Sequence, residues 1–287
     1  LASPERVIRT LAGLRPYRAS GFVVRAEALG DKRLVHNYGH GGAGITLSWG
    51  SSKLATQLGL PGHRGPVAVI GAGIMGLTTA RLVQEAGHPV TIYARALPPD
   101  TTSNVAGGQF SPFGHNREDA VTPEWRAQFA AALDYSWRRF QIMVGDDYGI
   151  RWLPTYTQGD GGPDPSNPLD RYHPGGRNLT RAEHPFPADG VARYETMYVE
   201  TGRFLHQLME DVQTAGGRIA VRNFASPADI GPALSPTAAF QLLQGVETLL
   251  VVAGTQGARD QRLGLVELRA FASAARALAV GITRIRP

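Results

Sequence analysis

The sequence contains no cysteine and no long apolar run, and each absence excludes a class of protein. Without cysteine there is no disulfide framework, no thiolate metal site and no cysteine nucleophile. No apolar run approaches the roughly 20 residues that a membrane-spanning helix needs, so we expect no membrane partner. No signal peptide is visible, but the chain begins with Leu1 rather than methionine, so a cytoplasmic and an exported location both stay open.

Blocks of like charge are also missing. The net charge of +5 comes mostly from arginines that are scattered along the chain. A nucleic-acid surface would need a clustered basic stripe or a reader motif, and the sequence has neither. We therefore expect small anionic partners, such as a dinucleotide or a carboxylate substrate, and no nucleic acid. With 287 residues, 43% of them hydrophobic, the chain can bury the core of one large domain or two smaller ones.

What the sequence does contain is a strand–glycine turn–helix unit. The apolar run Val67–Ile70 leads into Gly71-Ala72-Gly73-Ile74-Met75-Gly76, then helical spacing over Leu77–Glu85 and a second apolar run, Val90–Tyr93. In such a unit the first glycine makes the turn, the second admits a pyrophosphate and the third allows close helix–strand packing. The helix N-terminus adds free N–H groups and partial positive charge. The unit predicts a Rossmann-like α/β fold that binds a dinucleotide; a purely structural glycine turn is the alternative.

Apolar periodicity predicts the remaining elements. Helices are expected over residues 1–13, Ser51–Leu58, Pro123–Met143, Thr201–Ala215 and Leu268–Leu278, with Thr201 as an N-cap. Strands are expected over Phe22–Val24, Leu34–Val35, Ile150–Tyr156, Tyr194–Val199, Ile219–Val221 and Thr248–Val252. Gly59–Pro66 is predicted to be a linker and Gln158–Gly176 a long loop, because both are rich in turn residues.

A second glycine-rich run precedes the first. Residues His36–Thr46 read HNYGHGGAGIT, with four glycines within six positions, which requires a backbone that turns sharply or lies against something flat. His36 and His40 lack a set of further ligands, so we predict no metal site. Asp146 and Asp147 are interpreted as a solvated helix end rather than a catalytic pair.

Together these runs resemble the D-amino-acid oxidase family of flavoproteins. The His-Asn-Tyr-Gly-His-Gly-Gly run is the more specific part, and Gly71–Phe113 adds a segment similar to the family's second flavin-contacting loop. Tyr198–Ile219 resembles the family pattern more loosely. In the family the histidine–glycine run lies near the C-terminus, whereas here it comes before the dinucleotide turn. The order indicates a circular permutation in which Gly59–Pro66 joins the old ends.

The resemblance implies FAD as the cofactor and a division into two domains. An FAD-binding domain would comprise residues 34–112 and 203–256, and a mixed α+β substrate domain residues 1–33 and 113–202. The substrate domain is expected to be incomplete, because the tyrosine-bearing strands of the family have no counterpart after Thr255, and residues 257–287 stay unassigned. The implied cofactor contacts are Gly71, Gly73, Ile74, Met75, Gly76, Arg95, Thr101, Thr102, Ser103, Gly108, Gln109, Phe224, Gly41, Gly42, Ala43, Gly44, Ile45 and Thr46.

The activity implied by the resemblance is oxidative deamination of a D-amino acid. A hydride would pass from the substrate Cα to flavin N5, and O2 would then be reduced to hydrogen peroxide. Arg15 matches the family arginine that binds the substrate carboxylate, a task that suits the two parallel donors of a guanidinium, with Arg18 as the fallback. The Gly42 carbonyl would accept the substrate amine, and Gly41–Thr46 would lie along the isoalloxazine ring.

Two other functions stay open at this point. Arg95 stands where dinucleotide enzymes usually place an acid for the ribose hydroxyls, and an arginine there suits a 2′-phosphate, so an NADP-linked oxidoreductase is one alternative. A flavin-binding relative without oxidase activity is the other, because half of the expected substrate pocket is missing. A homodimer is possible, and the sequence does not indicate which amino-acid side chain is accepted.

Overall fold

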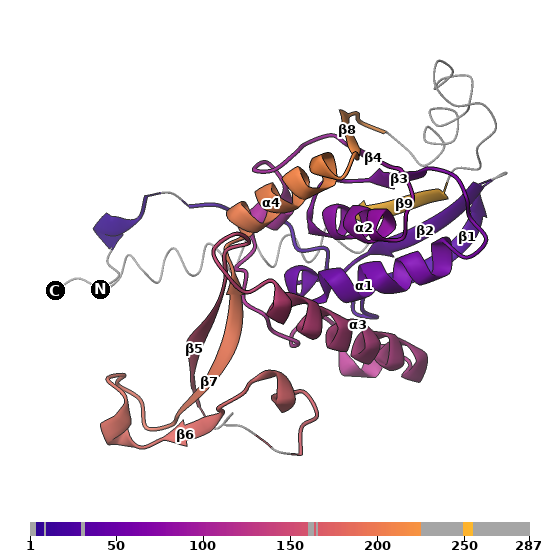
Figure 1. The fold of residues 1–287 in the computed structure, drawn as a ribbon. Coiled ribbons are helices and arrows are strands. Elements are labelled where there is room, and N and C mark those ends of the chain that lie inside the picture. The colour runs from indigo at the N-terminus through magenta and orange to yellow at the C-terminus, as the bar shows by residue number, and fades with distance from the viewer. Residues whose placement is uncertain are drawn as a thin grey trace.

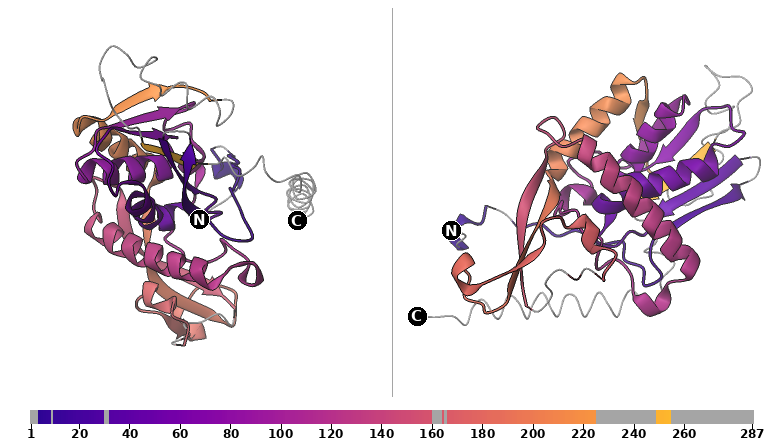
Figure 2. Two further views of the ribbon diagram at one scale, coloured as in Figure 1. Left: turned by 90° about the vertical axis from the view of Figure 1, so that its right-hand side faces the viewer. Right: turned by 60° about the horizontal axis from the view of Figure 1, so that its bottom comes forward.

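The computed structural model describes residues 4–8, 10–29, 32–159, 164, 166–224 and 249–254. Within these ranges it contains a six-stranded sheet, a three-stranded sheet and four α-helices. Helices α1, α2 and α4 lie against the larger sheet, α3 packs on the outside of α1, and the smaller sheet projects away from them (Figures 1 and 2).

The six-stranded sheet is almost entirely parallel. Its order is β1-β2-β9-β3-β4-β8, and only the β1–β2 pair is antiparallel. The strands are β1 (Val23–Leu29), β2 (Lys32–Tyr38), β3 (Val67–Ile70), β4 (Val90–Ala94), β8 (Arg218–Val221) and β9 (Leu249–Gly254). Because β2, β9, β3, β4 and β8 run in the same direction, their carboxyl ends meet at one edge of the sheet.

Helices cover one face of this sheet. Helix α1 (Gly44–Gly59) follows β2, α2 (Ile74–Glu85) follows β3, and α4 (Thr201–Thr214) packs beside α2. Helix α3 (Pro123–Ile142) packs along α1, with Thr122 as its N-cap. A Cβ added at Gly50 of α1 would lie 1.8 Å from the Ala132 carbonyl oxygen, so the two backbones are in direct contact.

The smaller sheet is antiparallel, in the order β5-β7-β6. Its strands are β5 (Ile150–Gln158), β6 (Arg177–Leu179) and β7 (Val191–Val199). The Val199 N–H donates to the Gly108 carbonyl at 2.9 Å, which joins the carboxyl end of β7 to the loop after β4. Short 3-10 helices form η1 (Pro4–Arg6), η2 (Thr102–Val105), η3 (Glu118–Ala120), η4 (Asp170–Tyr172) and η5 (Arg181–Glu183).

The predicted Rossmann-like α/β fold is confirmed, and so are most predicted strands and the long helix α3. On helix α3 (Pro123–Ile142), Leu133 and Phe140 are fully buried. The helix predicted over residues 1–13 is wrong, because only η1 forms, and Val7, Ile8 and Leu11 are exposed. A short helix needs a packed apolar face, and this segment has none among the described residues.

Three element ends differ from prediction. Helix α1 begins at Gly44 rather than Ser51, and α2 begins at Ile74 rather than Leu77, because burial against neighbouring helices outweighs the low helix propensity of glycine. Thr201 is the first residue of α4 and not its N-cap; Glu200 holds the cap position. The Thr201 hydroxyl instead donates to the Asn104 carbonyl at 3.0 Å. The helix predicted over residues 268–278 lies outside the described residues.

The predicted domain boundaries stay a prediction. Strand β1, which falls in the first segment of the expected substrate domain, is the antiparallel edge strand of the large sheet. The described helices include none that is long and apolar enough to cross a bilayer.

Candidate active site

Both glycine-rich runs lie at the carboxyl edge of the parallel sheet. One run links β2 to α1 and the other links β3 to α2, and β9 is hydrogen-bonded between β2 and β3. The two helix starts are neighbours, since a Cβ added at Gly44 would lie 4.0 Å from Ile74 Cγ2. Neither helix has an acidic residue in its first turn, so the partial positive charge of both N-termini is directed at this edge.

The β3–α2 turn requires glycine for reasons of backbone geometry. Gly71 has φ +112°, which favours glycine, and its N–H donates to the Tyr93 carbonyl of β4 at 2.8 Å. A Cβ at Gly76 would lie 1.8 Å from the Gly71 carbonyl oxygen, so the third glycine brings the helix directly onto the turn. These are the roles that a dinucleotide turn assigns to its first and third glycines.

The loop after β4 docks onto the starts of both helices. The Ile74 N–H donates to Ser103 Oγ at 3.0 Å, and a Cβ at Gly73 would lie 3.0 Å from the same oxygen. Further along the loop, the Ser111 N–H donates to Thr46 Oγ1 of α1 at 3.0 Å. Thr101, Thr102 and Ser103, expected to form a second cofactor loop, are therefore beside the first turn of α2.

Gly108 and Gln109 have contacts that the sequence did not indicate. Gly108 has φ +76°, and a Cβ there would lie 2.1 Å from the Val199 carbonyl oxygen, so packing against β7 accounts for the glycine. Gln109 forms an isolated bridge with Tyr198 of β7, and its side chain lies 3.5 Å from the Tyr194 hydroxyl. These two residues connect the smaller sheet to the site.

The β2–α1 turn is covered by the segment of residues 13–18. A Cβ at Gly13 would lie 2.5 Å from Val105 Cγ2. The Gly41 N–H donates to the Pro16 carbonyl at 3.1 Å, and a Cβ at Gly42 would lie 2.5 Å from Arg15 Nη2. The segment thus runs from the loop after β4 to the β2–α1 turn.

Arg15 and Gly42, both predicted to contact the substrate, are therefore adjacent. The missing side chain at Gly42 leaves room for the Arg15 guanidinium, which donates through Nη2 to the Gly114 carbonyl at 2.7 Å. Arg18, the fallback, lies elsewhere: its side chain packs on Gly39, and its guanidinium lies 5.7 Å from the centre of the Tyr38 ring.

Two buried histidines lie beneath this segment. His40 is 2% exposed and stacks on Phe22, with ring centroids 5.0 Å apart. Burial lowers the pKa of His40 to about 3, and the neighbouring His115 lowers it further in the same direction. Burial also lowers the pKa of His115, so both rings are neutral at pH 7. His36 instead contacts Glu27 across the β1–β2 pair at 2.8 Å.

Arg95 and Phe224 lie at the ends of β4 and β8. Arg95 is exposed, and beside it the Arg222 N–H donates to the Ala94 carbonyl at 2.8 Å. The Arg222 guanidinium lies 5.2 Å from the centre of the Phe224 ring, which also makes an edge contact with Tyr93. No local sequence signal indicates Arg222, because its contact with Phe224 lies at an edge formed by the pairing of β8 with β4.

Potential metal ligands do not gather in the part of the chain that the structure describes. That part holds no group of three or more His, Cys, Asp or Glu side chains placed to bind a metal ion. Asp146 forms an exposed ion pair with Arg151 at 2.9 Å, in agreement with its interpretation as a solvated position.

The amino-acid sequence matches one protein-family model over most of its length. Residues 1–58 and 66–232 match the model described as FAD dependent oxidoreductase. The chain belongs to this family of FAD-dependent oxidoreductases. FAD is the family's cofactor, and the residues present fit a dinucleotide, because the turn carries no side chain at Gly71, Gly73 and Gly76 and the sheet edge there has two helix N-termini.

Individual relatives match shorter segments. The D-amino-acid oxidase of Streptomyces coelicolor is 49% identical over 53 residues, which are 18% of this chain and 17% of that protein. D-aspartate oxidase 1 of Caenorhabditis elegans is 38% identical over 58 residues, again 18% of this chain and 17% of that protein. The matched segments thus span less than a fifth of these curated relatives.

Two solved structures are similar to this chain over about half of their own length. Glycine oxidase from Bacillus cereus aligns with a TM-score of 0.36 and 17% identity, covering 54% of this chain and 47% of that one. The L-amino acid deaminase from Proteus vulgaris aligns with a TM-score of 0.37 and 15% identity, covering 67% of this chain and 47% of that one.

Proposed function

We propose that this member of the family is an oxidase that deaminates a D-amino acid. The observation that carries the proposal is the position of Arg15, whose guanidinium lies against Gly42 at the sheet edge that also holds the dinucleotide turn. An arginine beside a dinucleotide turn can bind a carboxylate next to the cofactor.

The glycine turns and the loop between them would hold FAD. Gly71, Gly73 and Gly76, with Ile74 and Met75, would bind the pyrophosphate through backbone N–H groups, and Thr101, Thr102 and Ser103 would add hydroxyl groups. Gly41–Thr46, Gly108 and Gln109 would contact the flavin ring, and Arg95 and Phe224 the adenosine end. The chemistry supplied by bound FAD is acceptance of a hydride from the substrate Cα, followed by reoxidation by O2 to hydrogen peroxide.

The substrate would be oriented by two groups of this chain. Arg15 donates through Nη2 to the Gly114 carbonyl, and because a guanidinium carries five N–H donors, this one bond does not use them all and further donors would serve a carboxylate. The Gly42 carbonyl would accept a hydrogen bond from the substrate amine. Holding the carboxylate and the amine fixes the Cα between them, so positioning rather than acid–base chemistry is the contribution of the protein.

We also propose that the chain is a circular permutation of the family order. The family match is interrupted only at residues 59–65, which coincides with the linker predicted to join the old ends. In the sheet, β2 from the start of the chain pairs with β9 from its far end, and β9 pairs with β3. Both observations support the proposal, because a permutation would leave a joining segment outside the family match and would separate neighbouring strands of the sheet along the chain.

The decisive experiment is the absorption spectrum of the purified protein after addition of FAD, recorded before and after anaerobic addition of D-alanine and other D-amino acids. We expect a bound-flavin spectrum that bleaches with at least one of them, and hydrogen peroxide on admission of air. A flavin spectrum that no amino acid bleaches would instead favour a binding relative without oxidase activity. A protein that binds NADPH and no flavin would overturn the proposal.

The Arg15→Met variant tests the assigned role. Removing the bidentate partner of the carboxylate should raise KM for the amino acid about 100-fold, because hydrogen bonds to charged groups contribute about 1.5–3 kcal/mol each. The affinity for FAD should be unchanged. An unaltered KM would show that the carboxylate binds elsewhere.

A further inference from the structure

The Arg15 guanidinium is held by a loop that neither glycine motif contains. Its Nη2 donates to the carbonyl of Gly114, a residue with φ +72°. Among the described residues, no atom other than those of its chain neighbours lies within 4 Å of a Cβ added at Gly114, so the glycine serves the conformation of the loop rather than a close contact. The direction of the guanidinium therefore depends on where residues 113–121, here called the Gly114 loop, place one carbonyl group.

One side of the Gly114 loop contacts the segment that carries Arg15. The Arg117 N–H donates to the Ala19 carbonyl at 2.9 Å, and the His115 carbonyl oxygen lies 3.2 Å from the Cβ position of Gly41. The other side rests on α3, because the His115 ring is 3% exposed and stacks on Phe129 with centroids 4.6 Å apart. The Gly114 loop thus lies between α3 and the candidate substrate site and contacts both.

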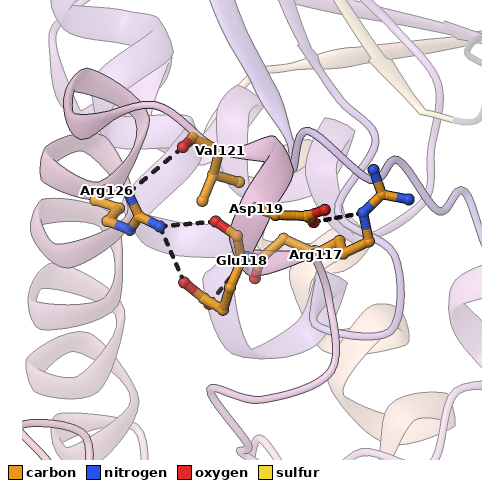
Figure 3. A network of polar contacts seen from close by, with 6 residues as sticks. Arg117, Glu118, Asp119, Val121 and Arg126 are labelled. Carbon is orange, nitrogen blue, oxygen red and sulfur yellow. Dashed lines mark hydrogen bonds and ion pairs between the residues drawn. The ribbon is translucent and has the colours of Figure 1, made fainter.

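Arg126 of α3 fixes the C-terminal half of this loop. Its Nη2 donates to the Glu118 carbonyl at 2.8 Å and to Glu118 Oε2 at 3.2 Å, and its Nη1 lies 3.4 Å from the Val121 carbonyl (Figure 3). A second pair in Figure 3, Arg117 with Asp119, lies within the loop itself. One guanidinium therefore holds two main-chain carbonyls and a carboxylate, which is more than an exposed ion pair alone would fix.

We infer that Arg126 is a positioning residue for substrate binding, acting through the Gly114 loop on Arg15. The inference rests on the proposed function in taking Arg15 as the carboxylate ligand. The physical path has three links: Arg126 to the Glu118–Val121 turn, the loop backbone to the Gly114 carbonyl, and that carbonyl to Arg15 Nη2. A displaced carbonyl would let the guanidinium move, and a shift of about 1 Å in a binding group is enough to weaken a bidentate contact strongly.

The test is Arg126→Met in the full, FAD-loaded chain, since methionine keeps an unbranched apolar stem and removes every donor. We expect KM for the amino acid to rise about tenfold while kcat at saturation stays within about twofold. The dissociation constant of benzoate, read from the change in flavin absorbance, should rise by the same factor, whereas that of uncharged benzamide should not. Arg126→Lys, which keeps the charge and one donor direction, should restore part of the affinity.

Arg138→Met is the matched control. Arg138 lies on the same helix, is exposed, and has no hydrogen bond or ion pair with the described residues. The Arg138→Met substitution should leave the benzoate affinity and the KM for the amino acid unchanged. Should Arg126→Met fail to fold, Glu118→Gln, which removes one charged acceptor and keeps the loop backbone, gives the same readout at smaller amplitude.

The possible outcomes separate this inference from the proposed function. Benzoate affinity within twofold of the parent in Arg126→Met would overturn the inference, and so would an equal loss of FAD affinity, which would mark a general structural role. If no amino acid is oxidised but benzoate binding falls in both Arg15→Met and Arg126→Met, the oxidase proposal fails and the positioning role stands. If Arg15→Met leaves benzoate binding intact, Arg15 is not the carboxylate ligand and both fail.

Discussion

The two glycine turns at the sheet edge have the same strand–turn–helix form, but different atoms impose their glycines. In the β3–α2 turn the constraint is internal, because Gly76 packs on the carbonyl of Gly71 only five residues earlier. In the β2–α1 turn the constraints come from elsewhere in the chain: Arg18 lies on Gly39, Arg15 on Gly42, and the His115 carbonyl near Gly41. One turn is a self-contained backbone motif, whereas the other is a surface shaped to receive distant residues.

This difference explains why spacing alone predicts the strand–turn–helix form of the first turn, whereas a role for the second turn is predicted only by the family resemblance. A motif closed by its own backbone has the same geometry wherever it occurs. A turn whose glycines make room for distant side chains shows only that space is needed, not what fills it. Substitutions in the two turns should accordingly fail in different ways.

Gly76→Ala should have the largest effect. Its Cβ would lie 1.8 Å from a main-chain oxygen that cannot rotate away, so the helix must move off the strand. We expect a loss of at least about 3 kcal/mol in the free energy of unfolding, together with loss of bound flavin. Gly107→Ala, where the added Cβ has no atom within 4 Å in the described part of the chain beyond its chain neighbours, is the control for thermal unfolding and flavin content. A stable, flavin-bound Gly76→Ala would show that the turn is not closed on itself.

Gly42→Ala should have an intermediate effect and a different readout. The added Cβ meets the far end of a flexible side chain, so Arg15 is displaced while the backbone stays in place. We expect KM for the amino acid to rise about tenfold, because roughly one hydrogen bond to a charged group is lost. The free energy of unfolding should be nearly unchanged. Steady-state kinetics and chemical unfolding of the same preparation measure both. A loss of stability as large as that of Gly76→Ala would erase the distinction between the turns.

His40→Phe should have the smallest effect at neutral pH and a distinct effect in acid. The folded-state pKa of His40 is about 3, below the ordinary value of 6.5, so the unfolded chain takes up a proton first as the pH falls. The neutral His40 ring therefore makes its full contribution to the free energy of unfolding above pH 6.5. That contribution is lost as the pH falls from 6.5 to 3, by up to about 1.4 kcal/mol per pH unit.

Removing the ring nitrogens should flatten that acid dependence, since phenylalanine keeps the stack on Phe22. Urea unfolding between pH 4 and 7 measures the slope. His206→Gln, at an exposed position of α4, should leave the slope close to that of the parent. Equal slopes for the parent and His40→Phe would show that His40 is protonated or exposed in the folded protein.

Much of the fold was predictable because its signals are local. The β3–α2 unit, helix α3 with its Thr122 cap, and the strand periodicities all depend on residues within a few positions of one another. The errors arose where a distant partner decides the outcome. Helix α1 starts seven residues early because Gly44–Gly50 packs on α2 and α3. The 3-10 helix η1 is not extended, because Val7, Ile8 and Leu11 after it are exposed and do not pack on the described part of the chain.

Within the site, the residue types were predictable and their partners were not. Arg15 is in a Leu-Arg-Pro turn that indicates a surface position, and no local feature indicates that Gly114 would accept its hydrogen bond from 99 residues away. Two further contacts, Gly108 with Val199 and Ser103 with the start of α2, likewise join segments that are far apart in the sequence.

The sequence by itself determined a strand–glycine turn–helix unit, a Rossmann-like α/β fold and the absence of cysteine chemistry, because each follows from composition or from spacing between nearby residues. The tertiary structure decided that both glycine turns meet at one sheet edge and that Arg15 lies on Gly42 under the Gly114 loop. The reason is that strand order and loop packing are set by burial between segments far apart in the chain, which no local pattern encodes.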